Sequence, residues 1–280
     1  MFGVGLSGFD KNDEWMASNS RAKKTTVLPR KLIIVNQSFI STLIAVLFMP
    51  AVGTASALGA DQTFSVTTQI FVGEQKTPAS EHQILFDQGL VYDVPVINRR
   101  FITVFDPAQK RVTLLDRDTQ VQASVSTDDL IKITAQARAT VSDDEQKKKL
   151  GMQAQVESSQ NGQGYTIKFA NIEYHTTTQK PKDRGIATDY AMFVDLASRL
   201  NLVRRLGPPP FGRMTLHQKL AANAELPLEL KLIVTGSKQT ETYRSTHSVD
   251  DMTDTDRETI DEVRGYLALY RQVDLNVFPK

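Results

Sequence analysis

Cysteine is absent from all 280 residues, and this absence excludes several chemistries at once. No disulfide can form, so the stability of an exported chain must come from an apolar core. Thiol catalysis is excluded for the same reason. A bacterial lipoprotein carries its lipid on a cysteine just after the signal peptide, so a lipid anchor of that kind is excluded as well.

The sequence also lacks an excess of charge of either sign, with 33 basic and 32 acidic residues. Residues 1–57 contain six basic and three acidic residues, which leaves residues 58–280 with a net charge of −2. Nucleic acids and anionic lipid headgroups both require a concentrated basic surface. We therefore expect no nucleic-acid partner, and contact with a membrane only through the leader described below.

Motifs for catalysis or metal binding are missing too. There is no G-x-S-x-G elbow and no H-E-x-x-H pair, and the histidines are scattered, at His82, His175, His217 and His247. The acidic residues 250–258 lack the glycine and distal glutamate of an EF-hand, and the start of a helix explains them better. We predict no catalytic residue, no cofactor and no metal. A hydrolase stays a third hypothesis, which a cleft joining His175 or His247 to a carboxylate and a hydroxyl would support.

The chain begins with a segment that has the layout of a secretory signal peptide. A basic block at residues 21–31 precedes an apolar run at residues 39–49, then Pro50 and the small residues 51–57. Ala55 and Ala57 form an A-x-A cleavage site, with Ala60 as the alternative. We predict a leader over residues 1–57 with a long n-region, in which Met16 is an alternative start. The product is expected in the periplasm or outside the cell, and an uncleaved membrane anchor is the alternative.

Residues 62–126 are predicted to form consecutive antiparallel hairpins. Alternating apolar residues are separated by turn sequences such as Asp87-Gln88-Gly89 and the loop that opens at Asp106-Pro107. Glu173 and His175 lie two positions apart in a later strand and share one face, either as a functional pair or, as we favour, on a polar outer surface. Helices are predicted from Thr127, from the capping box Ser142–Glu145, from Thr188-Asp189, around Thr215–Ala222, and from the capping box Thr255–Glu258.

These elements predict one exported domain over residues 58–280 with an α+β fold. Its sheet is expected to be curved, mostly antiparallel and half-barrel-like, with helices packed on one face, the concave one. An apolar cavity between the sheet and the helices would be lined by Ile84, Phe86, Val91, Phe101, Val104, Val112 and Leu114. The same residues would equally serve an ordinary filled core.

Three segments resemble the periplasmic lipoprotein-carrier proteins of the LolA-like superfamily: Ile84–Asp93, Ile102–Pro107 and Arg111–Asp116. The resemblance covers residues 62–126, and the C-terminal half has no counterpart in it. It implies a curved antiparallel half-barrel that is closed by helices and binds acyl chains in an apolar interior. No ligand-contacting residue can be transferred. Leu226–Leu230, Arg244–Asp251 and the final helix are also similar to exported bacterial proteins, which adds no activity.

The sequence thus leads to a first hypothesis of an exported, non-enzymatic envelope protein. It would bind an apolar ligand, or a lipidated partner protein, in the space between sheet and helices. The alternative is a structural or protein-interaction module of the cell envelope without a ligand cavity.

Overall fold

The computed structural model describes residues 62–159 and 162–279, which belong to one compact unit. The predicted leader over residues 1–57, the alternative start at Met16, and the cleavage positions Ala55, Ala57 and Ala60 all lie outside these residues. Cleavage and export therefore stay predictions. Among the helices that the structure describes, none has the length and apolar character needed to cross a bilayer.

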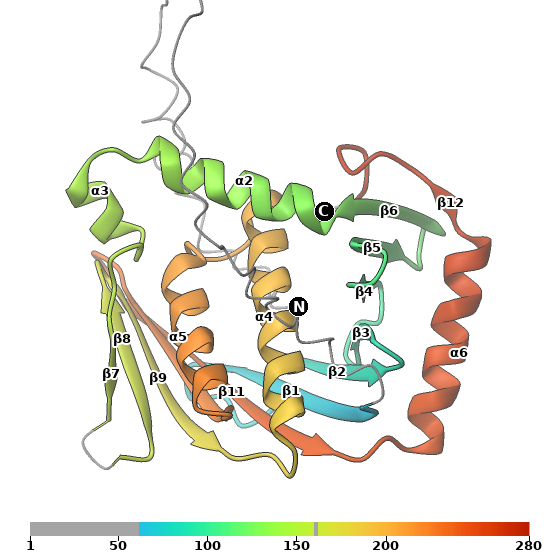
Figure 1. Ribbon diagram of the computed structural model, residues 1–280, viewed down its shortest axis with the longest axis horizontal. Helices are drawn as coiled ribbons and strands as arrows, with labels where there is room; N and C mark the ends of the chain where they lie inside the picture. The colour runs from blue at the N-terminus through green and yellow to red at the C-terminus, as the bar shows by residue number, and fades with distance from the viewer. Residues whose placement is uncertain (1–61, 160–161, 280) are drawn as a thin grey trace, which may run out of the picture. The chain divides into compact units, whose positions relative to one another are not determined.

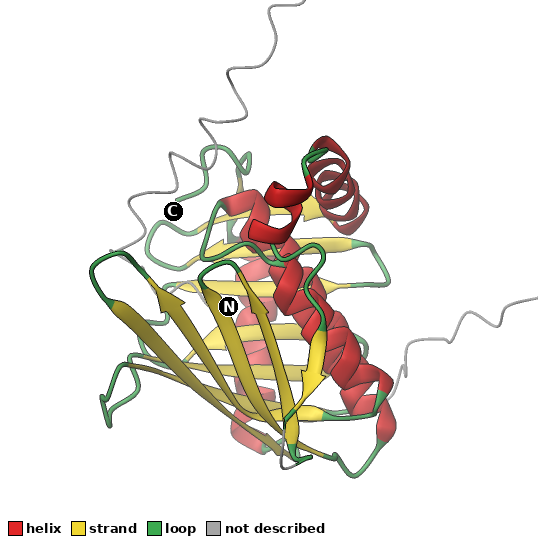
Figure 2. Cartoon of the chain, turned by 90° about the vertical axis from the view of Figure 1, so that its left-hand side faces the viewer, coloured by secondary structure: helices red, strands yellow, loops and turns green. Residues whose placement is uncertain are grey.

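The described residues form one 12-stranded sheet that does not close into a barrel (Figures 1 and 2). Its strand order is β12-β6-β5-β4-β3-β2-β1-β11-β10-β9-β8-β7. All neighbours are antiparallel except the short edge strand β12, which runs parallel to β6. The strands are β1 (Phe64–Val72), β2 (Ser80–Asp87), β3 (Leu90–Pro95), β4 (Phe101–Asp106), β5 (Arg111–Asp116), β6 (Val121–Ser126), β7 (Val156–Ser158), β8 (Gly164–Phe169), β9 (Ile172–Gln179), β10 (Leu226–Thr235), β11 (Thr240–Asp250) and β12 (Arg271–Gln272).

The first six strands form the predicted meander of hairpins. In the β2–β3 turn, Gln88 and Gly89 have φ values of 51° and 76°. Positive φ at both central residues is the property of a type I′ turn, whose twist matches that of the flanking strands. Lys110, at the end of the Asp-Pro loop between β4 and β5, also has a positive φ of 51°. The two turns read from the sequence therefore set the register of this half of the sheet.

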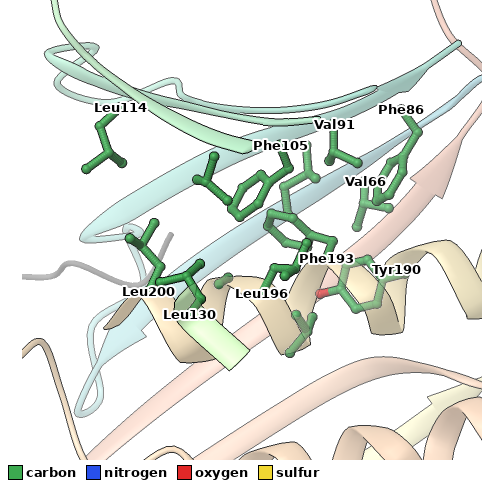
Figure 3. Close-up of a cluster of buried hydrophobic side chains, with 14 of the residues drawn as sticks. Val66, Phe86, Val91, Phe105, Leu114, Leu130, Tyr190, Phe193, Leu196 and Leu200 are labelled. Atoms are coloured by element: carbon green, nitrogen blue, oxygen red, sulfur yellow. The ribbon is translucent and has the colours of Figure 1, made fainter. Parts of the chain in front are cut away.

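Three helices lie on one face of the sheet, which we call the inner face. The longest of them is α4 (Arg184–Arg204), which runs along the concave side between the two ends of the sheet, beside α5 (Phe211–Ala222) and α2 (Thr127–Thr140) (Figure 1). The short helix α3 (Asp144–Lys149) connects α2 to β7. Phe193 of α4 is central to the inner core, since its ring meets Phe105 edge-on at 5.2 Å and Phe86 at 6.2 Å (Figure 3).

The last helix, α6 (Asp254–Leu269), packs on the opposite face, which we call the outer face. Its Ile260 and Val263 contact strand residues whose side chains alternate with those of the inner core, among them Leu85, Tyr92 and Leu115. The predicted α+β class with a curved antiparallel sheet is confirmed. The placement of all helices on one face needs a correction for α6, because β2–β5 are apolar at both alternating sets of positions.

Helix starts differ from the predicted ones by a few residues. The capping box of α6 is formed by Thr253 and Asp256 rather than by Thr255 and Glu258. Asp183, not Thr188 or Asp189, accepts the N-terminal hydrogen bond of α4. Asp143 caps α3, one residue after the predicted Ser142. Several Ser, Thr and Asp residues precede each of these three helices, and the surrounding packing selects among them.

The cap of α6 can be tested with two threonines that lie two positions apart. Replacement Thr253→Ala should lower the free energy of unfolding by about 1 kcal/mol, because the Asp256 amide loses the side-chain oxygen that it donates to. Thr255→Ala is the matched control and should change it by less than about 0.5 kcal/mol. Urea unfolding followed by circular dichroism measures both. An equal loss in the two variants would contradict this assignment of the cap.

A candidate ligand pocket beside a buried polar cluster

A small pocket lies between strands β1 and β2 and helices α4 and α5. Its lining combines apolar and polar side chains. The apolar residues are Ile84, Phe193, Val194 and Ala197, and the polar ones are Thr68, His82, Ser198, Asn201 and Arg213. Its open volume of ≈ 20 Å³ has room for roughly one water molecule. In the described structure this pocket is therefore too small to hold a small-molecule ligand.

Six of the seven residues predicted to line a cavity belong to the inner face. Ile84 lines the pocket itself, and Phe86, Val91, Val112 and Leu114 are buried in the same inner core, against which Phe101 packs. Val104 is the exception. It lies in the outer core with α6, because the alternation of β4 turns its side chain away from α4, and it cannot line this space.

His247 of β11 is the centre of a buried hydrogen-bond network next to the pocket. Its Nδ1 lies 3.1 Å from both Thr68 Oγ1 and Tyr190 Oη, and its Nε2 lies 3.1 Å from Ser245 Oγ. Ser245 Oγ donates to the main-chain oxygen of Leu230 at 3.3 Å. Because the serine proton is used there, we assign the Nε2–H tautomer to His247, with Nδ1 accepting from a hydroxyl.

The electrostatic surroundings keep this imidazole neutral. Burial, with the nearby positive charge of Arg213, lowers the pKa of His247 to about 3. Burial also raises the pKa of Tyr190 to about 12. The hydroxyl and the imidazole therefore both stay uncharged at neutral pH. A base with so low a pKa accepts a proton poorly at that pH, so the network is better suited to hydrogen bonding than to proton transfer.

His217 and Arg213 lie one turn apart on α5 and add further polar groups to the interior. His217 is 3% exposed, its Nε2 has no hydrogen-bond partner, and burial holds its pKa well below the usual value. Burial likewise lowers the pKa of the Arg213 guanidinium, which borders the pocket. Asn201 Oδ1, on the pocket wall, is also buried without a partner. Unsatisfied polar atoms of this kind are uncommon in a purely structural core.

A short charge-assisted contact on the inner face joins His82 to Asp93. His82 Nδ1 lies 2.6 Å from Asp93 Oδ1, and both residues are buried. His82 lines the pocket, and Asp93 lies on the neighbouring strand β3. The buried carboxylate of Asp93 therefore has the His82 imidazole as a hydrogen-bond partner.

Glu173 and His175 do share the outer face, as their spacing predicted. Glu173 Oε1 lies 2.8 Å from His175 Nε2, and Thr166 Oγ1 lies 3.2 Å from Nδ1. Carboxylate, imidazole and hydroxyl are thus in line, but the side chains of His175 and Glu173 are 43% and 27% exposed on the sheet surface. Their accessibility indicates the polar outer surface that we favoured rather than a catalytic cleft.

The other candidate sites resolve into structural features. The described part of the chain contains no group of three or more residues that could hold a metal ion. Among the acidic residues 250–258, Asp256 is buried and accepts hydrogen bonds from the Thr253 main chain and the Gln83 side chain. His247 is surrounded by hydroxyls, and the hydrogen bonds described for it involve no carboxylate.

Sequence reasoning did not single out Thr68, Tyr190, Ser245 or Arg213. A signal for the strand residues was present, because Thr68 and His82 occupy the same alternating positions as Val66 and Ile84. A polar residue among inward-facing apolar ones indicates a buried polar group. The helical residues gave no comparable signal, since their partners lie on strands far away in sequence.

The neutral histidines predict how stability depends on pH. When folding lowers the pKa of a histidine, the unfolded chain binds a proton at pH values where the folded protein does not. The contribution of the neutral His247 to the free energy of unfolding is therefore complete above its unfolded pKa of 6.5. This contribution is lost as the pH falls toward about 3. Each such histidine changes the free energy of unfolding by about 1.4 kcal/mol per pH unit within this window.

His247→Gln should therefore reduce the pH slope of the unfolding free energy by about one proton equivalent between pH 6 and pH 4, roughly the window given by linkage. Denaturant titrations at a series of pH values measure the slope. His175→Gln removes an imidazole from the exposed outer face and is the control. Equal slopes for the His247 variant and the unchanged protein would contradict the neutral, buried assignment.

No protein-family model matches the sequence, and none of the curated proteins is significantly similar to it. The resemblance of residues 62–126 to the LolA-like superfamily therefore stays a prediction. Any assignment of function has to depend on the pocket and on the buried polar cluster beside it.

Proposed function

We propose that this chain is an exported, non-enzymatic envelope protein that binds an apolar ligand, or the lipid of a lipidated partner, between the inner face of the sheet and α4. The observation that carries the proposal is the pocket between β1, β2, α4 and α5. Four apolar and five polar side chains line it together. An amphiphilic molecule likewise combines an apolar chain with a polar head.

The buried polar atoms beside the pocket support a ligand over a purely structural core. His217 Nε2 and Asn201 Oδ1 are enclosed without partners, and each such atom costs about 1–3 kcal/mol. A core selected only for stability would replace them with apolar groups. A hydrogen-bond donor on a ligand bound in the pocket would satisfy Asn201 Oδ1, which lies on the pocket wall, and would offset this part of the cost.

The pocket must open to admit such a ligand. Its volume of ≈ 20 Å³ is far below the roughly 300–1,000 Å³ of typical small-molecule sites. Helix α4 is joined to the sheet by side-chain packing around Phe193, which can readjust while the strand ladders stay intact. The small volume is also the observation that favours the alternative, a structural or interaction module without a cavity.

The proposal includes no catalytic step. The buried imidazole of His247, which has several hydroxyl partners, has a pKa of about 3 and is a weak base at neutral pH. The exposed row of Glu173, His175 and Thr166 lies outside the pocket. A hydrolase therefore has the least support of the three hypotheses.

Export and ligand binding are testable together. When the full chain is produced in a bacterial host and the exported product is weighed by native mass spectrometry, we expect a start at Leu58 or Asp61 and additional mass that organic extraction removes. Trp15 is the only tryptophan and lies in the predicted leader, so the product should show tyrosine emission alone. A bare mass after gentle purification would instead favour the structural module.

Two adjacent residues of β2 offer a matched test of where the ligand binds. Ile84 lines the pocket, whereas Leu85 packs against α6 on the outer face, and both are fully buried. Ile84→Ala should weaken binding of the neutral apolar dye phenylnaphthylamine by about tenfold, since apolar contact is lost. Leu85→Ala should lose comparable stability, about 2–5 kcal/mol, with dye affinity unchanged. Fluorescence titration of the folded variants measures affinity, and equal effects would place the dye elsewhere.

A further inference from the structure

We infer that the outer face of the sheet carries a second binding site, a groove over β1, β11, β10 and β9 that takes a short neutral saccharide. This site goes beyond the proposed function, because its side chains alternate with those that face the inner pocket. The inference follows from the volume of the groove, its hydroxyl groups, its balanced charge and one exposed leucine.

The groove has the size of a ligand site. Its volume is ≈ 420 Å³, within the roughly 300–1,000 Å³ of typical small-molecule sites. Helix α6 packs on the outer face over β2–β5, and the groove lies over the strands that follow in the sheet order. A ligand therefore fits without the movement of a helix. The lining residues are Thr67, Gln69, Thr177, Leu228, Glu229, Thr246, Ser248 and His247, whose imidazole belongs to the inner network.

Hydroxyl groups dominate the polar part of the groove. Thr246 of β11 lies directly opposite Gln69 of β1 and Glu229 of β10, and Glu229 lies opposite Thr177 of β9, so the four form one row across the sheet. In the described part of the chain, the hydroxyls of this lining make no hydrogen bond to other protein groups. A hydroxyl both donates and accepts, so this surface matches a ligand that carries several hydroxyls itself.

The charge in the groove is balanced. Glu229 is the one charged side chain of its described lining, and its Oε2 lies 3.7 Å from Nη1 of Arg244. Gln69 Nε2 donates to Glu81 Oε2 at 2.8 Å, which orients the amide and leaves its oxygen as an acceptor. An anionic ligand would approach the Glu229 carboxylate, and a cationic one the guanidinium of Arg244. A neutral molecule avoids both repulsions.

A β-bulge places an apolar side chain in the groove. The register of β10 against β9 shifts between Pro227 and Glu229, so Leu228 is the additional residue. Leu228 lines the groove and is 47% exposed. Bulges re-aim side chains and are common next to functional sites. A sugar ring carries C–H groups on its faces and hydroxyls at its edge, so it can pack on Leu228 while it binds the row of hydroxyls.

Trisaccharides that differ in charge test the inference on the purified product of the full chain. Maltotriose, cellotriose and triacetylchitotriose are the neutral probes, deacetylated chitotriose is the cationic probe, and trigalacturonate is the anionic one. Each is titrated by calorimetry at neutral pH. We expect at least one neutral probe to bind with a Kd of about 1 mM or lower, and to bind more tightly than either charged probe.

Two threonines of β11 locate the site. Thr246→Val removes one hydroxyl at nearly constant volume and should weaken binding of the neutral saccharide about fivefold. Thr242→Val is the matched control, because Thr242 lies on the same strand and face, two rows away opposite Ile233 and outside the groove lining. Its affinity should be unchanged. Urea unfolding verifies that both variants are folded.

A third variant tests the apolar contact. Leu228→Ala should weaken the saccharide by a similar factor, because the surface under the sugar ring is lost. Its effect on the free energy of unfolding should be small, since the side chain is half exposed in the unliganded protein.

The outcomes separate this site from the inner pocket. Tightest binding of a charged probe would overturn the neutral class, and equal losses in Thr246→Val and Thr242→Val would place the saccharide outside the groove and overturn the inference as well. The absence of binding by all five probes would overturn it while leaving the proposed function standing, since that function is tested with phenylnaphthylamine and Ile84→Ala. Ile84→Ala should leave the saccharide affinity unchanged.

Discussion

The sheet carries apolar side chains on both of its faces through β2–β5, and the rest of the architecture depends on this constraint. Successive residues of a strand point to opposite sides, so Ile84 and Phe86 require cover on the inner face while Leu85 requires it on the outer face. Helix α4 supplies the first cover and α6 the second. Two cores therefore share one layer of backbone.

This arrangement separates two tasks. The outer core is closed by α6, which Arg264 further joins to the strands through Asp87 at 2.9 Å. The inner side holds the small pocket, the neutral histidines and the guanidinium of Arg213. Burying polar and charged groups of this kind costs free energy. A sheet that is stabilised from outside can tolerate such groups inside. The proposed binding of an amphiphile draws on this division between a stabilising face and an adaptable one.

The sequence predicted much of the local structure, because local structure depends on neighbours. The Asp87-Gln88-Gly89 turn, the Asp106-Pro107 loop and the antiparallel class all follow from short-range patterns, and they are confirmed. Val104 was placed on the wrong face because its strand, Phe101–Asp106, is apolar at consecutive positions, so alternation alone could not orient it. The polar cluster was missed because its members come from β1, β11, α4 and α5, and nothing local relates Thr68 to Tyr190 or His247.

Strand β1 pairs on one side with β2, its neighbour in sequence, and on the other with β11 near the end of the chain. Thr68 and His247, which face each other across this second pairing, are 179 residues apart. Contacts so distant in sequence form slowly, and they cannot form at all before the last strands are available. The two halves of the sheet can join only when nearly the whole chain is present. A chain that passes through a membrane channel before it folds would meet this requirement on the far side, where both partner strands first arrive together.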